Sequence, residues 1–282
     1  MSLKSAFISL WMLLLAFALV HTGISLWRAP TSLVWWAALL ALLPVMLFFA
    51  GLFLQRTPRT SRIVAYPFVA QIVALGLLLV AAPGGIAPWI YVVGVGGLGS
   101  LLYQFWYSRL DRKPADMLVE GEWLQPLVFD DATGKPFSTD DLQGPLLMIF
   151  FRGNWCPLCM AQIREIAGQY RELASRGVNT LLISPQPHDN TRELALKFDV
   201  PFLFLVDREF RVAQELGIMA RGGTPMGMEM LGYESDTVYP TVVMTDARRR
   251  IIFVDQTDNY RVRPEPETFL RVLDQHGLQS AG

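Results

Sequence analysis

Cys156 and Cys159 are the only cysteines of the 282-residue chain, and two residues separate them in the stretch FFRGNWCPLC. The apolar run 145–151 predicts a buried strand, and a helix is expected from Cys156 to about Ser175. A sulfur at a helix N-terminus faces unpaired backbone N–H groups and the positive end of the helix dipole, which favour thiolate over thiol. Pro157 fits the first helical turn, where its missing N–H costs nothing. The pattern predicts a reactive thiol.

The spacing returns Cys159 to within one helical turn of Cys156, so that it can attack a mixed disulfide formed there. Arg152 either adds positive charge near Cys156 or points to solvent. Zinc is an alternative, but it needs two further ligands, and His188 and His276 lie far apart on expected surface turns. Two structural cysteines are the other alternative. C-P-x-C at a strand-to-helix junction favours a redox-active Cys156–Cys159 disulfide, with no metal and no other cofactor.

The elements that must hold this motif follow from the rest of the second half of the chain. Short apolar runs alternate there with amphipathic ones, which predicts an α/β domain over 117–282 with a largely parallel sheet. The stretch 218–238 lacks a clean period and predicts a long insertion. The expected strands are 178–184, 201–207 and a hairpin of 240–246 with 250–256, and the expected helices are 190–199, 208–216 and 264–277.

The motif resembles the active-site segment of the thioredoxin superfamily, in which an aromatic residue, here Trp155, precedes a C-x-x-C that opens a helix. Residues 117–275 resemble the redoxin branch, the AhpC/TSA (peroxiredoxin-like) family, through DATGKPFSTDDLQGPLLMIFF, GVNTLLISPQ, VPFLFLVDREFRVAQELGI and YPTVVMTDARRRIIFV. This resemblance implies an oxidoreductase with a thioredoxin-like fold, a central mixed sheet flanked by helices. It also implies that Pro240 is cis and that the backbone of Tyr239, Pro240 and Thr241 binds substrate. A trans Pro240 that only starts a strand is the alternative.

Three positions depart from the family pattern. Peroxiredoxins carry P-x-x-x-T-x-x-C before the reactive cysteine, whereas Ile149 and Gly153 occupy the Pro and Thr offsets here. The Thr that positions peroxide is therefore missing. Thioredoxins also carry a buried Asp on the strand before the motif, and Phe150 stands at that place. Proton transfer during disulfide exchange must use water or another group.

The first half of the chain has the composition of a membrane domain. Hydrophobic residues make up 52% of the protein and charged residues 17%, and charges are absent from long stretches before Arg109. About 20 apolar residues of helix cross a bilayer. Four spans are therefore expected in 1–108, followed by a linker at 109–116. The expected spans are 6–27, 32–54, 63–82 and 87–108.

The basic residues predict the orientation of these spans. With four spans, the N-terminus, the middle loop and the second half of the chain share one side, and Arg28 is the only basic residue of the loops on the other. The domain is therefore expected in the cytoplasm, attached to the inner or plasma membrane. A first span cleaved as a signal peptide would invert this result. The basic residues on the domain side are Lys4, Arg56, Arg59, Arg62, Arg109, Arg112 and Lys113.

The sequence leaves three functions open. The first is a membrane-anchored thiol–disulfide oxidoreductase in which Cys156 attacks and Cys159 resolves. The second is a peroxide reductase with antioxidant activity, in which Cys156 becomes a sulfenic acid and Cys159 condenses with it. The third is a non-catalytic membrane redox sensor or assembly factor. The expected partners are protein or small-molecule thiols and disulfides, peroxides, the lipid bilayer and an unidentified electron donor. The net charge of −1 argues against nucleic acid.

Overall fold

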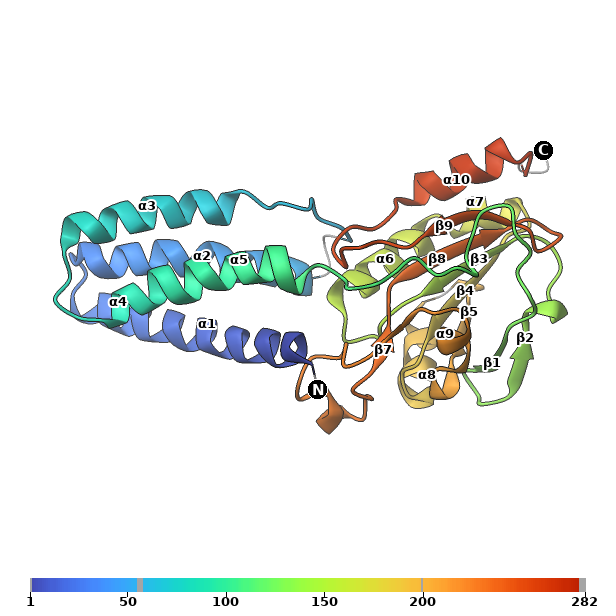
Figure 1. The fold of residues 1–282 in the computed structure, drawn as a ribbon, viewed down its shortest axis with the longest axis horizontal. Coiled ribbons are helices and arrows are strands. Elements are labelled where there is room, and N and C mark those ends of the chain that lie inside the picture. The colour runs from blue at the N-terminus through green and yellow to red at the C-terminus, as the bar shows by residue number, and fades with distance from the viewer. Residues whose placement is uncertain (1, 55–57, 199, 279–282) are drawn as a thin grey trace.

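The computed structural model of the chain describes residues 2–54, 58–198 and 200–278. A bundle of apolar helices and an α/β domain lie end to end, and the N-terminus lies at the end of the bundle that faces the domain (Figure 1). Arg56 of the orientation argument lies outside the described residues, as do residues 279–282 of the expected domain.

The bundle consists of α1 (Leu3–Arg28), α2 (Leu33–Phe53), α3 (Tyr66–Ala81) and a fourth helical course from Ala87 to Tyr107. Ser2 caps α1 by accepting a hydrogen bond from the Ser5 backbone N–H at 3.1 Å. The fourth course alternates α and π geometry without a break in helical backbone. Its pieces are α4 (Ala87–Trp89), η1 (Ile90–Leu98), α5 (Gly99–Leu102) and η2 (Tyr103–Tyr107).

Two of the four expected spans have the length and composition needed to cross a membrane. These are α1, with 26 residues, and α2, with 21 residues. The third expected span, 63–82, contains an apolar helix of only 16 residues, because residues 63–65 are not helical. The fourth, 87–108, is divided into short α and π segments. A membrane region of four spans is therefore not confirmed.

Glycines in the fourth helical course allow its neighbours to pack closely. A Cβ atom added at Gly96 would lie 2.5 Å from the Gln71 side chain of α3, and one at Gly99 would lie 2.0 Å from the Trp11 indole of α1. The Trp11 indole N–H donates to the carbonyl oxygen of Val95 at 2.9 Å. The sequence GVGGLG thus serves helix packing, as its position in an apolar span predicts.

A seven-stranded mixed sheet in the order β2-β1-β5-β4-β3-β8-β9 forms the centre of the domain. Only β3 with β4 and β4 with β5 are parallel, so the largely parallel sheet expected from the alternating pattern is wrong. The mixed sheet agrees with the thioredoxin-like resemblance. The strands are β1 (Val128–Asp131), β2 (Pro136–Ser138), β3 (Leu146–Phe150), β4 (Asn179–Ser184), β5 (Leu203–Val206), β8 (Thr241–Thr245) and β9 (Ile251–Asp255).

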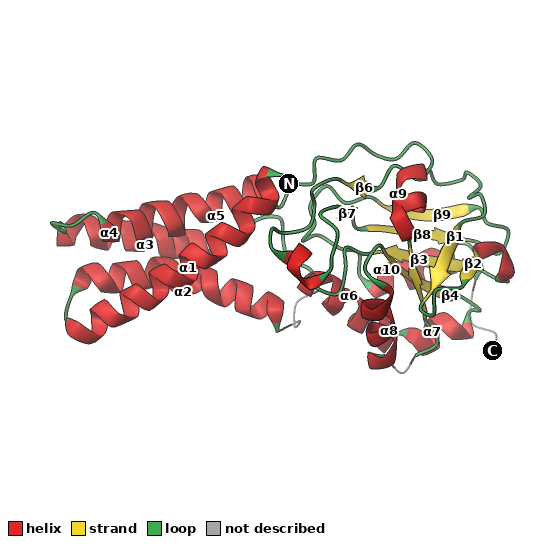
Figure 2. Ribbon diagram, turned by 90° about the horizontal axis from the view of Figure 1, so that it is seen from below, coloured by secondary structure: helices red, strands yellow, loops and turns green. Residues whose placement is uncertain are grey.

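Helices cover both faces of this sheet (Figure 2). On one face, Leu147 and Ile149 of β3 pack with apolar residues of α6 (Pro157–Gly168), α7 (Tyr170–Ser175), α8 (His188–Lys197) and α10 (Pro266–Gln275). On the other face, Met148 and Phe150 pack with α9 (Arg211–Glu215) and the segment 115–127. The apolar cluster on the α6 face continues without interruption into the bundle core. The domain and the bundle therefore share one continuous hydrophobic core.

The expected insertion 218–238 contains a small sheet of β6 (Met219–Ala220) and β7 (Thr237–Val238) and a turn of helix, η5 (Met228–Leu231). It docks on α1. Three serines on one face of α1, Ser2, Ser5 and Ser9, donate hydrogen bonds to backbone carbonyls of this insertion. The acceptors are the oxygens of Gly222, Thr224 and Met226, at 2.6, 2.7 and 2.8 Å.

A fully buried arginine, Arg261, forms the second contact between the bundle and the domain. Its guanidinium donates to the Ser108 hydroxyl at 2.9 Å, to the Thr60 hydroxyl at 2.9 Å and to the carbonyl of Arg62 at 2.7 Å. It also lies 5.6 Å from the centre of the Tyr103 ring. The guanidinium is thus buried with its hydrogen bonds satisfied. Loss of one of its partners would leave a buried charge unpaired, which is costly, so these bonds help to hold the domain on the bundle.

Candidate active site

The dithiol lies where β3 ends and α6 begins. Cys156 is the N-cap of α6 in extended conformation, and its sulfur accepts the Cys159 backbone N–H at 3.4 Å. Pro157 occupies the first turn, as expected. Both thiols are free, and their sulfurs lie 2.6 Å apart. The pair has the position and spacing needed for one sulfur to attack a bond formed on the other.

Two buried arginines surround the sulfur pair. Arg152, which sequence analysis left between two orientations, points inward: it is 9% exposed, and its guanidinium lies 4.7 Å from the Trp155 ring centre and 5.7 Å from that of Tyr260. It also donates to the carbonyl of Gly223. Trp155 thus positions Arg152 beside the motif.

The second arginine, Arg263, was not found by sequence reasoning. It is 5% exposed, and its Nη2 lies 3.6 Å from the sulfur of Cys159. Its Nε donates to the carbonyl of Tyr260 at 2.9 Å, and its Nη1 donates to the Gln162 side chain at 3.2 Å. It follows β9 by several residues and reaches the motif only through the folded chain, so no local pattern indicates it.

Charge, burial and hydrogen bonding give the two thiols different pKa values. Burial alone would raise the pKa of Cys159, but the hydrogen bond with Cys156, the Arg263 guanidinium and the Arg152 backbone N–H and charge lower it to about 6. Burial and the hydrogen bond with Cys159 raise the pKa of Cys156 well above its usual value. The pair of thiols therefore loses one proton below neutral pH, and the two sulfurs share the proton that remains. The negative charge rests mainly on Cys159, although helix position alone predicted it on Cys156.

A carboxylate also faces this group of charges. Asp255 ends β9, and burial raises its pKa, whereas the charges of Arg263 and Arg112 lower it. Phe150 stands at the place of the buried acid of thioredoxins. It is fully buried in the sheet core, and its side chain cannot donate or accept a proton. Asp255 is thus a titratable group, coupled to the site through Arg263, that the sequence did not indicate.

An apolar cavity of about 270 Å³ lies between the dithiol and the bundle. Cys156 lines it, whereas Cys159 does not. Cys156 is 2% exposed and Cys159 0% exposed, so a small molecule in this cavity would contact Cys156 and not Cys159. Its walls come from α1, α2 and the motif and include Ile8, Met12, Phe49, Leu52, Trp155 and Leu158.

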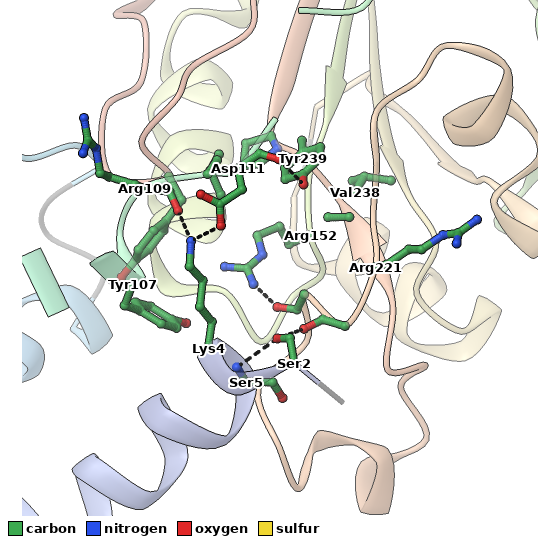
Figure 3. Close-up of a pocket in the computed structure, with 16 residues that line it drawn as sticks. Ser2, Lys4, Ser5, Tyr107, Arg109, Asp111, Arg152, Arg221, Val238 and Tyr239 are labelled. Carbon is green, nitrogen blue, oxygen red and sulfur yellow. Dashed lines mark hydrogen bonds and ion pairs between the residues drawn. The ribbon is translucent and has the colours of Figure 1, made fainter. Parts of the chain in front are cut away.

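A second, polar cavity of about 230 Å³ lies on the other side of Arg152 (Figure 3). Lys4, Arg109, Arg152 and Arg221 line it, and Lys4 forms an ion pair with Asp111 at 2.6 Å. Figure 3 shows the Arg152 guanidinium directed into this space between α1 and the insertion. The two cavities share three lining residues, Tyr107, Arg152 and Tyr260.

The expected substrate-binding stretch lies beside the motif but is already occupied. Thr241 pairs with Phe150 across β8 and β3, and Tyr239 and Pro240 line the polar cavity. Pro240 is trans, since no peptide bond in the described part of the chain is cis; the cis expectation is wrong. Arg112 of the linker donates to the Pro240 carbonyl at 3.1 Å and lies 5.2 Å from the centre of the Tyr239 ring.

Comparisons with known proteins agree with this architecture. A sequence model of the AhpC/TSA family matches residues 122–254. The thiol-disulfide oxidoreductase ResA of Bacillus subtilis is 25% identical over 147 residues, which cover 44% of this chain and 79% of ResA. Residues 122–254 thus form an AhpC/TSA domain of the thioredoxin superfamily, with a thioredoxin-like α/β fold and a mixed sheet.

Solved structures superpose on part of this chain. Peroxidoxin BcpB of Mycobacterium tuberculosis superposes with a TM-score of 0.45 at 21% identity, covering 55% of this chain and 96% of that one. AhpC of Enterococcus faecalis superposes with a TM-score of 0.47 at 14% identity, covering 57% and 93%.

Proposed function

We propose that the AhpC/TSA domain of this chain is a membrane-anchored dithiol–disulfide oxidoreductase that works through Cys156 and Cys159. The observation that carries the proposal is the sulfur pair, 2.6 Å apart at the N-terminus of α6 and next to a buried guanidinium 3.6 Å from Cys159. Cationic groups and a helix N-terminus favour the thiolate, which is the form that attacks disulfides. The resemblance to a thiol-disulfide oxidoreductase supports the same chemistry.

The positions of the two sulfurs give each a role. Cys156 lines the apolar cavity and is the sulfur that meets substrate. The proton on Cys156 passes to the Cys159 thiolate, 2.6 Å away. The Cys156 thiolate then attacks one sulfur of a disulfide, and the other sulfur leaves as a thiolate that takes a proton. Cys159 then attacks Cys156 and releases the substrate's remaining thiolate, so that the pair becomes a disulfide and the substrate gains two electrons. The chain holds no third cysteine, and an external thiol donor must restore the pair.

We also propose that all four helical courses of the bundle cross the membrane, with the domain in the cytoplasm. The N-terminus, the loop before α3 and the linker all meet the domain. Ser2 donates to the Gly222 carbonyl at 2.6 Å, Arg62 pairs with Asp258 at 2.7 Å, and Arg112 donates to the Pro240 carbonyl at 3.1 Å. Arg28 lies at the end of α1 away from the domain. An excess of basic residues on the domain side supports a cytoplasmic location. Reporters fused after Gly282 test this proposal. A reporter that is active only in the cytoplasm should be active, whereas activity only of a reporter that works in the periplasm would reverse the assignment.

Trapping of a mixed disulfide tests the proposed function. The full-length Cys159→Ser protein in detergent, mixed with hydroxyethyl disulfide, should retain one hydroxyethyl thiol on Cys156, because the resolving sulfur is missing. The Cys156→Ser protein should retain far less, since Cys159 is fully buried. Equal trapping in the two variants would contradict the assigned roles. No trapping in either variant would reject the function.

Peroxide reduction is the second candidate. The match to the AhpC/TSA family and the small cavity at Cys156, with Arg152 on its wall, favour it. Here Cys156 would displace water or an alcohol from the peroxide and become a sulfenic acid, which Cys159 would convert to the disulfide with loss of water. Stopped-flow mixing of the reduced protein with hydrogen peroxide tests this candidate. Oxidation no faster than that of a free thiol would remove it.

A further inference from the structure

The apolar cavity has its walls in both halves of the protein. Ile8 and Met12 come from α1, Phe49 and Leu52 from α2, and Cys156 from the start of α6. The helices α1 and α2 are the two that are long and apolar enough to cross a membrane. The sulfur of Cys156 therefore shares an apolar cavity with the two described helices that are candidate membrane spans.

A polypeptide substrate does not fit the occupied backbone beside the motif. An added peptide strand needs free backbone N–H and C=O groups. The Pro240 carbonyl accepts a hydrogen bond from Arg112 at 3.1 Å, and the Tyr239 N–H donates to Ile218 at 2.7 Å. The Tyr239 carbonyl accepts from the Thr241 hydroxyl at 2.9 Å. The cavity volume of about 270 Å³ suits a small molecule instead.

The residues that line the cavity indicate which kind of head group that molecule would have. Arg152 and Cys156 line the cavity together with five aromatic residues, which are Phe49, Phe53, Tyr107, Trp155 and Tyr260. Aromatic side chains stack on a flat ring, and a guanidinium donates to carbonyl oxygens. The peroxide-positioning Thr of peroxiredoxins is absent, since Gly153 stands there. The lining therefore favours a flat, carbonyl-bearing oxidant over a peroxide.

We propose that this cavity binds a lipid-soluble quinone and that Cys156 and Cys159 reduce it to the hydroquinone. The proposal rests on the dithiol function above and names its membrane substrate. The Cys156 thiolate adds to the quinone ring, and Cys159 attacks the Cys156 sulfur and displaces the ring as hydroquinone. The two thiols lose two electrons and two protons and become a disulfide, and the two quinone oxygens receive both protons. No other reactant enters this half-reaction.

A single-turnover experiment tests the proposal on the full-length protein in nanodiscs. The reduced protein is mixed with decylubiquinone, whose ring is fully substituted, and hydroquinone formation and the Cys156–Cys159 disulfide are measured. Met12→Trp fills the cavity from α1, whereas Leu13→Trp places the same side chain at a position that is 68% exposed. Each methylene excluded from an apolar site costs about fourfold in affinity. We expect Met12→Trp to slow oxidation at least tenfold and Leu13→Trp to stay within twofold of wild type.

Further measurements keep the proposal falsifiable. Equal rates for Met12→Trp and Leu13→Trp would overturn the quinone site. Rapid oxidation by a long-chain hydroperoxide with no oxidation by decylubiquinone would also overturn it. If decylubiquinone does not oxidise the wild-type protein but hydroxyethyl disulfide does, the dithiol function stands and only the assignment of a quinone substrate is wrong. Failure of both reagents would reject the dithiol function itself.

Discussion

Replacement of Arg263 by glutamine should raise the pKa at which the dithiol loses its first proton. The Arg263 guanidinium lies 3.6 Å from the Cys159 sulfur and is 5% exposed. Its charge is among the causes that lower the pKa of Cys159 to about 6. Glutamine is neutral and shorter, and it keeps a polar amide in the side chain. The first ionisation should therefore move to higher pH.

Coulomb's law gives the size of this effect. Two unit charges 3.6 Å apart interact by roughly 4–5 kcal/mol at an effective dielectric constant of about 20. Part of this is lost because Arg152 remains and water can enter the space left by the shorter side chain. Opposite charges at such distances shift a pKa by about 1–3 units. The first ionisation of the Arg263→Gln protein should therefore fall at a pH of about 7–9.

The assay is the ultraviolet absorbance of thiolate, taken as the difference between the reduced and oxidised proteins across the pH range. Burial raises the pKa of Tyr260 well above its usual value, so this phenol stays neutral there. An equilibrium titration is preferable to an alkylation rate, because a thiolate of higher pKa is also more nucleophilic and partly offsets its lower population. Below the midpoint the pair holds both protons, and above it one proton is lost.

Two variants separate charge from damage to the fold. Arg263→Lys keeps a cation and should leave the midpoint within about one unit of wild type. Arg249→Gln removes a half-buried arginine that bonds to the carbonyls of Thr139, Leu142 and Gly144, so it should cost stability and leave the thiol titration unchanged. A folded Arg263→Gln protein with the wild-type midpoint would refute the role assigned to this arginine.

Three further outcomes follow from packing. Gly99→Ala should destabilise the detergent-solubilised protein by about 1–3 kcal/mol, because the added Cβ would lie 2.0 Å from a tryptophan of α1, whereas Gly94→Ala has open space and should change the melting temperature little. Arg261→Ala should loosen the docking of domain on bundle and speed alkylation of the reduced pair at least severalfold, which mass spectrometry measures. Leu147→Ala, at a position with no exposure, should cost about 2–5 kcal/mol of unfolding free energy in denaturant titration, against a negligible cost for Leu196→Ala, which is 83% exposed.

The strands and helices next to the motif could be predicted because their signals are local. The expected strand 145–151 corresponds to β3 (Leu146–Phe150), and the expected hairpin corresponds to β8 and β9. Long apolar runs bounded by turn residues determine such buried strands. The hairpin of β1 and β2 was missed, because its strands are three or four residues long and polar at several positions. The expected single helix from Cys156 is divided at Gln169 into α6 and α7.

The dithiol could be predicted from its spacing, but its surroundings could not. The position of Cys156 at the N-cap follows from C-P-x-C after a strand. Arg263 lies 104 residues beyond Cys159 in sequence, and its contact with the sulfur depends on the path of the chain after β9. The helix N-terminus indicated Cys156 as the thiolate, whereas the hydrogen bond with Cys156 and the charge of Arg263 lower the pKa of Cys159 to about 6. Only the folded chain brings these groups together.

The role of the bundle follows from the polar contacts at its end rather than from its composition. A simple anchor needs only a flexible linker, yet a fully buried Arg261 and three serines of α1 hold the domain in one orientation. That orientation turns Cys156 toward α1 and α2 and away from solvent. The docked arrangement buries the Arg261 charge with hydrogen bonds to Ser108, Thr60 and Arg62. In the proposed function, the helices are therefore a wall of the site, and they would restrict its substrates to molecules small enough, and apolar enough, to enter between the two halves.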